Sequence, residues 1–244
     1  MDGISTSAAS GMAARMESLE MLANNLANIE TGGYKADREF YSLYTGEDAS
    51  ADPQTGDIST LSVIQSQWTD LSQGIMHETS NPLDFAIDGE GLFAVQTANG
   101  VRYTRNGNFR LSQAGALTTG DGSPLRAKDG GQLVVQAGVP VEVLADGTVQ
   151  QAGNVIGQLD IATFDVGALD KIGLNYFAPT AGAMPKPATG VVLQGKIEQS
   201  NVGTAESSVR LVAIMRQFEM LQKAMNIGNE LNRRAIEEVA RVTT

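Results

Sequence analysis

The two ends of this chain of 244 residues have the spacing of amphipathic helices. In residues 4–34 the recurring apolar positions are Ile4, Ala8, Met12, Met16, Leu19, Leu22 or Ala23, Leu26 and Ile29. In residues 201–242 successive positions of the row are separated alternately by three and four residues. They are Leu211, Ile214, Phe218, Leu221, Met225, Gly228, Asn232, Ala235, Val239 and Val242. An average spacing of about 3.5 residues is the period of a coiled coil. We therefore predict that the terminal helices pair with each other or with a partner.

The middle of the chain, from about residue 80 to residue 180, has the pattern of short strands separated by turns. Phe85 and Ile87 alternate with Asp84 and Asp88, which is the period of a half-buried strand. Six Asn-Gly or Asp-Gly pairs punctuate this region, ending at Gly89, Gly100, Gly107, Gly122, Gly130 and Gly147. Both residues of such a pair can take positive φ, so each predicts a two-residue hairpin turn. The predicted class is α+β, with paired N- and C-terminal amphipathic helices, coiled-coil-like, flanking a mostly antiparallel β domain.

The predicted organisation has four segments. Residues 1–44 and 196–244 form the two halves of a helical domain, residues 45–81 an extended connector, and residues 82–195 the β domain. The connector is rich in Ser, Thr, Asp and Gln, with Trp68 as the one Trp of the chain. Two interpretations of Trp68 remain open, namely that it covers the edge of a core or that it faces a partner.

The composition argues against several kinds of partner. A net charge of −11 disfavours nucleic acid and a polybasic membrane contact, both of which need clustered Lys and Arg. No stretch approaches the roughly 20 apolar residues that cross a bilayer, so no membrane insertion is predicted. The N-terminus lacks the basic start and apolar run of a cleaved secretory signal. We expect a chain that is cytoplasmic or exported by a machine that does not read such a signal.

The sequence holds no constellation of residues for catalysis. There is no Cys, and His77 is the one His, which excludes thiolate sites and paired-His metal sites. Residues 89–94 match G-x-G-x-x-A, but a strand pattern follows where a dinucleotide site needs a helix, so a turn is the better interpretation. We predict that the chain is no enzyme and takes no cofactor, metal or small-molecule substrate.

Polar residues interrupt both helical patterns. Asn24, Asn25 and Asn28 are poor residues for a helix interior, because their amides compete for backbone groups. They predict either a fraying helix end or amides that bond a neighbouring backbone across a packed interface, with Leu26 as the apolar anchor. Asn232 likewise either fixes register inside the C-terminal apolar row or faces solvent.

Several segments together resemble the flagellar rod and hook protein family. They are residues 24–28 followed by Thr31, Gly33, Tyr34 and Lys35, then residues 81–93, 103–109, 194–202 and 216–219. The blocks occur in the family's order and cover most of the chain. The short length and single β domain resemble the proximal rod subunit most, with the distal rod subunit as the alternative.

The resemblance implies a structural subunit of the flagellar basal-body rod that polymerises through its terminal helices and transmits torque in motility. It implies an inner tube made by these helices and an outer layer made by the β domain. The implied partners are further copies, other axial proteins and the flagellar type III export apparatus. The implied location is the periplasmic part of the basal body, reached without signal cleavage.

The residues predicted to lie in the assembly interface are Asn24, Asn25, Leu26, Asn28, Leu211, Ile214, Phe218, Leu221, Met225 and Asn232. Two alternatives stay open. One is another axial subunit, from the distal rod or the hook. The other is a soluble β binding module whose helices only dimerise.

Overall fold

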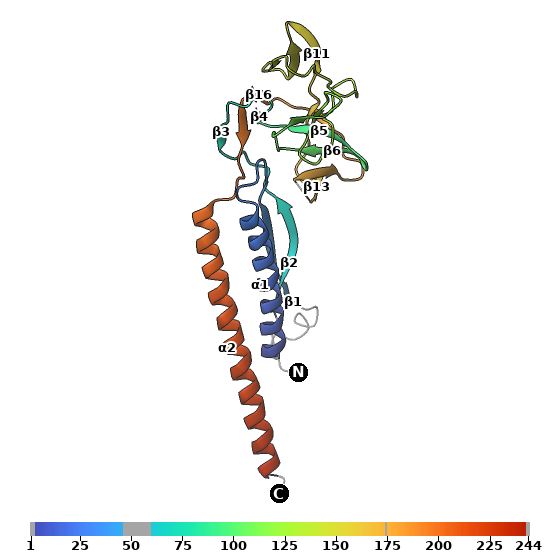
Figure 1. Ribbon diagram of the computed structural model, residues 1–244. Helices are drawn as coiled ribbons and strands as arrows, with labels where there is room; N and C mark the ends of the chain where they lie inside the picture. The colour runs from blue at the N-terminus through green and yellow to red at the C-terminus, as the bar shows by residue number, and fades with distance from the viewer. Residues whose placement is uncertain (1–2, 46–59, 174, 243–244) are drawn as a thin grey trace. The chain divides into compact units, whose positions relative to one another are not determined.

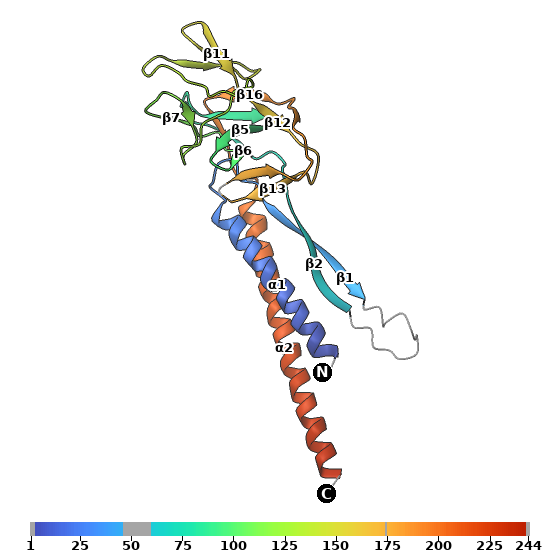
Figure 2. The same cartoon turned by 90° about the vertical axis from the view of Figure 1, so that its right-hand side faces the viewer.

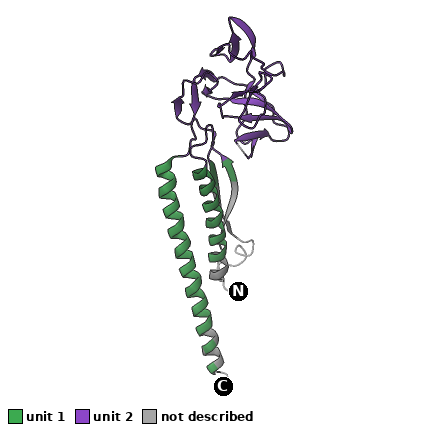
Figure 3. Ribbon diagram, in the orientation of Figure 1, with its two compact units in different colours: residues 1–27, 37–68, 203–244 green, residues 28–36, 69–202 purple. Residues whose placement is uncertain are grey.

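The computed structural model describes residues 3–45, 60–173 and 175–242. The chain divides into two compact units, drawn in different colours in Figure 3. Unit 1 holds residues 1–27, 37–68 and 203–244, so both ends of the chain belong to it. Unit 2 holds residues 28–36 and 69–202. The part of the predicted connector at residues 46–59 lies outside the described residues.

Unit 1 is built around two long helices. Helix α1 (Gly3–Ala27) and helix α2 (Thr204–Val242) lie side by side and run antiparallel in both Figure 1 and Figure 2. The C-terminal end of α2 extends past the N-terminal end of α1 in both views. Strands β1 (Asp37–Thr45) and β2 (Thr60–Thr69) form a two-stranded sheet in the same unit. The prediction of terminal helices flanking a β domain, and with it the α+β class, is confirmed.

The start of α2 follows ordinary capping rules. Gly203 precedes the helix, and the Ser207 amide donates to the Gly203 carbonyl at 2.9 Å. Glu206 stands in the first turn, where a negative charge is favoured by the helix dipole. Helix α1 ends at Ala27, directly before the turn in which the Thr31 amide donates to the Asn28 carbonyl at 3.1 Å.

The largest sheet of unit 2 has six strands, and each neighbouring pair in it is antiparallel. Its order is β13 (Leu169–Ile172), β14 (Tyr176–Pro179), β6 (Gly100–Thr104), β5 (Leu92–Thr97), β12 (Ile161–Thr163) and β15 (Lys186–Pro187). A second sheet joins β11 (Asn154–Gln158), β10 (Thr148–Gln151) and β9 (Val141–Val143).

Three two-stranded sheets complete unit 2. They pair β16 (Val191–Gln194) with β4 (Phe85–Asp88), β17 (Lys196–Glu198) with β3 (Met76–Glu78), and β7 (Arg110–Leu111) with β8 (Leu117–Thr118). The first two pairs bring the C-terminal part of the unit back to its first strands. The predicted mostly antiparallel β domain is therefore confirmed.

Strand β5 lies between two apolar clusters. Phe93 and Val95 belong to the larger cluster, and Leu92 and Ala94 belong to the smaller one. Successive side chains of a strand point to opposite faces, so burial on both faces explains a continuous apolar run. Trp68 belongs to neither cluster, and 49% of it is exposed, so it does not fill a core.

The predicted turns differ from the structure in two ways. Five of the six turn glycines have positive φ, but the Asn or Asp before each does not. The described residues other than Gly with positive φ are Ser80, Ala152 and Asn175. Gly107 makes no such turn: its carbonyl accepts the Phe85 amide at 2.9 Å, and an added Cβ would lie 1.5 Å from the Phe85 carbonyl oxygen. Close approach of two backbones, rather than positive φ, is what requires glycine there.

We expect Gly107→Ala to destabilise unit 2 by at least about 3 kcal/mol, because the new methyl group would force two buried backbones apart. Urea unfolding followed by near-ultraviolet circular dichroism measures this. Gly120→Ala is the matched control, since nothing lies within 4 Å of its added Cβ. Equal unfolding midpoints for the two variants would show that a methyl group at residue 107 is tolerated, which would contradict the prediction.

Candidate assembly site

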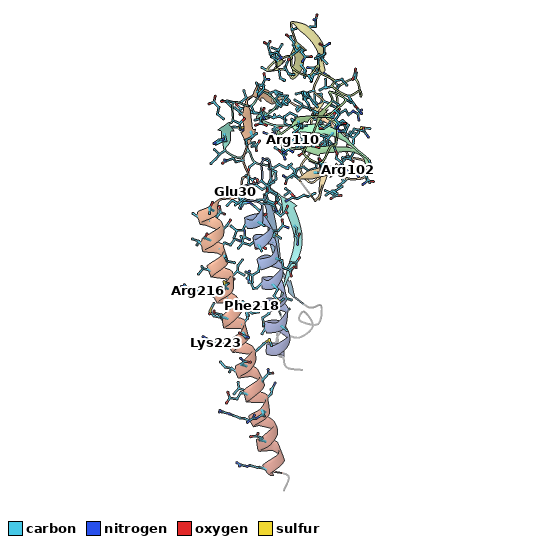
Figure 4. All side chains as sticks on the ribbon, in the orientation of Figure 1. Glu30, Arg102, Arg110, Arg216, Phe218 and Lys223 are labelled. Carbon is cyan, nitrogen blue, oxygen red and sulfur yellow. The ribbon has the colours of Figure 1, made fainter. Side chains whose placement is uncertain are left out.

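One face of α2 is turned towards α1. Ser207 and Ile214 are buried on it, and the side chains that share the face are half-buried, namely Leu211, Phe218, Leu221, Met225, Gly228 and Asn232. In Figure 4 Phe218 points between the helices, whereas Arg216 and Lys223 point away from α1. All six predicted α2 interface residues thus lie on this α2 inner face. The half-burial of Asn232 favours its placement in the apolar row over a solvent-facing one.

The α1 inner face coincides only in part with the predicted apolar row, and Ala8 and Leu22 belong to both. Its buried side chains are Ala8, Ala14, Ser18, Met21, Leu22 and Asn25. Of the predicted row, Met16 is 53% exposed and Leu26 is 37% exposed, so neither is buried in this helix pair, and Leu26 as an anchor of the assembly interface stays a prediction. The side chain of Ile4 lies outside the described residues.

The two helices approach closely because α1 offers small residues to large ones. A Cβ added at Gly11 would lie 3.4 Å from Leu221 Cδ1. Ala14 and Ser18 continue the same face along α1, and the Ser18 hydroxyl is satisfied by the Ala14 carbonyl at 2.9 Å. Small side chains let Leu221 and Phe218 of the partner helix pack against the α1 backbone. A pattern of large apolar residues marks only part of this face for this reason.

The predicted asparagines have separate roles in the structure. Asn25 is buried and clamps the start of β1: its Nδ2 donates to the Asp37 carbonyl at 2.8 Å, and its Oδ1 accepts the Asp37 amide at 3.0 Å. Asn28 Oδ1 accepts the Thr31 hydroxyl at 3.3 Å within the turn after α1, and Asn24 is exposed. Of the two interpretations, a bond to neighbouring backbone holds for Asn25, and that backbone belongs to the same chain.

Ion pairs attach β1 to the first turns of α2. Arg210 pairs with Glu39, whose side chain is nearly fully buried. Arg38 and Glu206 make a more exposed pair at 3.8 Å. The Arg210–Glu39 pair is the more specific of the two contacts because Glu39 is buried. Exposed ion pairs such as Arg38–Glu206 contribute only about 0–1 kcal/mol to stability.

A buried ion cluster organises unit 2. The Lys35 ammonium lies 2.5 Å from Glu198 Oε1, and Arg105 Nε lies 2.5 Å from Glu198 Oε2. Burial lowers the pKa of Lys35 from its ordinary value, and the Glu198 carboxylate partly offsets this effect. Two cations thus depend on one carboxylate, whose side chain has no exposed surface.

The remaining hydrogen bonds of the cluster go to the backbone. Lys35 Nζ donates to the Ser72 carbonyl at 2.5 Å, and Glu198 Oε1 accepts the Gly74 amide at 2.8 Å. Arg105 donates to three carbonyls of the β4–β5 turn, those of Ile87, Gly89 and Gly91. A buried charge needs hydrogen-bond partners, and the Arg105 guanidinium finds them in these three carbonyls. The same hydrogen bonds fix the path of the turn.

Asn201 adds a second set of backbone contacts beside the cluster. Its Oδ1 accepts the Ala36 amide at 2.8 Å, and its Nδ2 donates to the Asp70 carbonyl at 2.8 Å. Residues 31–36, 70–74, 87–107 and 198–201 therefore meet at one place in unit 2.

The sequence predicted no role for Lys35, Arg105 or Glu198, although each stands inside a motif block. Lys35 and Glu198 are 163 residues apart, a separation that no local pattern connects. Each of these three charged residues stands among Gly, Asn and apolar residues in its motif block. That contrast is the one feature of the sequence that could have marked them.

The described ranges hold no group of His, Asp and Glu side chains that could bind a metal ion. None of the helices described is both long and apolar enough to span a bilayer. The described residues form a pair of helices from the two ends of the chain and, from the residues that lie between them in the sequence, a separately organised β domain.

Comparison with known proteins identifies the family. Three family models match: flagella basal body rod protein over residues 6–35, flagellar hook protein FlgE/F/G D1 domain over 86–157, and flagellar basal body rod FlgEFG protein C-terminal over 193–238. The flagellar basal-body rod protein FlgF of Caulobacter vibrioides is 33% identical over 228 residues, covering 92% of each chain. FlgG of Bacillus subtilis is 30% identical, covering 91% of this chain and 93% of its own.

The chain belongs to the flagellar basal-body rod protein family, and it is a structural subunit of the rod. The matched segments correspond to most of α1 with the turn after it, to the segment from β4 into β11, and to the segment from β16 through most of α2.

Glu198→Gln should lower the unfolding free energy of unit 2 by about 3–5 kcal/mol, because it removes the carboxylate with which two buried cations pair. Urea unfolding of the purified chain measures the change. Glu78→Gln is the control, since Glu78 is an exposed carboxylate on the strand paired with β17 and should change stability by less than about 1 kcal/mol. A loss no larger than that of the control would contradict the assigned role of the cluster.

Proposed function

We propose that this protein is the proximal subunit of the rod, of the FlgF type, and that it polymerises through the helix pair of unit 1. In this proposal the helix pairs form a coiled-coil-like inner tube and unit 2 forms an outer layer. The rod then transmits torque by the stiffness of its packed helices. The family relationship and the pairing of the two chain ends support it.

The lengths of the alignments favour the FlgF type. The alignment with FlgF of C. vibrioides has 228 positions for 92% of this chain, which leaves almost no gaps. The alignment with FlgG of B. subtilis has 250 positions for a nearly equal share of the chain, so the additional positions are gaps in this chain. A chain that lacks these insertions fits the FlgF relatives better.

The observation that carries the polymerisation proposal is the apolar surface left on the helices after they have paired. Met16 and Leu26 of α1, and Met220 and Ile227 of α2, are exposed although each stands in a regular apolar spacing. A contact between different surfaces of successive copies does not close, so it can continue into a filament. We propose further that the flagellar type III apparatus exports this chain without signal cleavage. Its destination is the periplasmic part of the basal body.

Electron microscopy of basal bodies from a strain that lacks this gene tests the function. We expect rods that stop at the proximal segment, restored when the full chain is supplied from a plasmid. Rods of full length in the deletion strain would overturn the proposed position. A rod that stops only at its distal end would assign the chain to the distal type instead.

Phe218→Asp should abolish swimming and rod completion, because a carboxylate on the α2 inner face separates the two helices, while unit 2 stays folded. Motility assays and microscopy measure the first effect, and limited proteolysis of the purified chain measures the second. Gln222→Asp places the same charge at an exposed position of α2 and should leave assembly intact. Complete rods containing Phe218→Asp would contradict the role of the helix pair.

A further inference from the structure

The chain contains two Asn-Gly pairs, at residues 99–100 and 106–107. In such a pair the main-chain nitrogen of Gly can attack the side-chain carbonyl carbon of Asn and close a five-membered ring. Glycine favours this attack because it has no Cβ to crowd the nitrogen. The two reacting groups are already joined, which removes the entropy cost of bringing them together. Because both pairs have the same chemistry, their surroundings in the folded chain decide which of them reacts.

The first pair lies at the tip of the hairpin that joins β5 to β6 (Figure 1). Thr97 pairs with Gly100, so Ala98 and Asn99 form the turn. Asn99 is exposed, and among the described residues its side-chain amide has no hydrogen-bond partner. A Cβ added at Gly100 would meet nothing within 4 Å. The ring therefore has room to close at this pair.

Short-range bonds through one hydroxyl hold the turn. The Asn99 amide donates to Thr97 Oγ1 at 3.3 Å, and this hydroxyl donates to the Gly100 carbonyl at 2.8 Å. Loop tips are the parts of a fold that open locally at the lowest free-energy cost. Local opening leaves the Gly100 nitrogen free to lose its proton and to turn towards the Asn99 side chain.

The second pair is closely packed. Asn106 Oδ1 accepts the Asn108 amide at 3.0 Å, so the side chain of Asn106 is already engaged. Gly107 is buried, and its carbonyl accepts the Phe85 amide at 2.9 Å. A Cβ added at Gly33 would lie 2.3 Å from the Asn106 main-chain nitrogen. Ring closure at this pair would have to rotate a peptide plane that two other backbone segments already contact.

We infer that Asn99 is a site of spontaneous deamidation in the folded protein and that the fold protects Asn106 from the same reaction. This inference goes beyond the proposed function and does not depend on it. The one reactant besides the chain is water, with hydroxide as the catalyst.

Hydroxide takes the proton of the Gly100 amide, and the nitrogen forms a bond to Asn99 Cγ. The bond from Cγ to the side-chain nitrogen breaks, and that nitrogen takes a proton from water and leaves as ammonia, so hydroxide is regenerated. Water then hydrolyses the ring at one of its two carbonyl carbons. Cleavage at Cγ gives aspartate, whereas cleavage at the main-chain carbonyl gives isoaspartate, in which the backbone runs through Cβ. Either product adds a negative charge to the hairpin tip, and isoaspartate also lengthens the turn.

Trypsin separates the two pairs into different peptides of the full chain. Residues 39–102 and residues 106–110 each follow an Arg, end in an Arg and hold no other Lys or Arg. The first peptide contains one further Asn, Asn81, but Pro82 follows it and has no N–H with which to attack. The purified, folded chain is incubated in mildly alkaline buffer and sampled over several weeks. Mass spectrometry of the peptides measures the gain that accompanies replacement of an amide by a carboxyl group.

We expect the peptide 39–102 to gain this mass at least tenfold faster than the peptide 106–110. In guanidinium chloride, which unfolds the chain, both peptides should gain it at similar rates, because the protection of Asn106 depends on the fold. Asn99→Gln is the matched variant, since it keeps a side-chain amide at an exposed position but would have to close a six-membered ring. The mass gain should disappear from the peptide 39–102 of this variant.

Similar rates for the two peptides of the folded chain would show that the packing around Asn106 gives no protection, and would overturn the inference. Modification of the peptide 39–102 only in guanidinium chloride would overturn it as well, because the hairpin would then protect Asn99. A mass gain that persists in Asn99→Gln would place the reaction at another residue, with the same consequence.

Discussion

The fold of unit 2 depends on the carboxylate of Glu198. It stands on β17, near the C-terminal end of the unit, and holds Lys35 from the segment after α1 and Arg105 from the segment after β6. Without that charge two buried cations would lose the carboxylate with which both of them pair, and such a loss is strongly unfavourable. Arg105 extends the constraint to the β4–β5 turn through three carbonyls. Segments that are far apart in the chain are thus fixed in one place by one side chain.

Unit 1 depends on a different constraint, which is the size of the residues between its helices. Gly11, Ala14 and Ser18 allow the larger side chains of α2 to approach the α1 backbone. Met16 and Leu26 of α1 are left exposed, whereas Met21 and Leu22 are buried. In the proposed rod, folding of the subunit and contact between subunits would use different faces of the same two helices.

Much of this could be predicted from the sequence, for identifiable physical reasons. The 3.5-residue spacing of Leu211 to Asn232 placed one face of α2 correctly, because that face is lined by large apolar side chains. The turn glycines marked a β domain, because positive φ is a local property of the backbone. The same reasoning was wrong for Gly107 and only partly right for the inner face of α1, because the deciding factor at both places is a close approach to a distant segment.

The sequence by itself determined the α+β class, the antiparallel β domain between helical ends, and membership of the rod family, since these follow from local spacing and from ordered motif blocks. Only the tertiary structure decided which face of α1 meets α2, that Asn25 clamps the backbone of Asp37, and that Lys35, Arg105 and Glu198 form one buried cluster. The physical reason is that burial and charge pairing depend on neighbours in space, and residues 35 and 198 become neighbours only when the chain has folded.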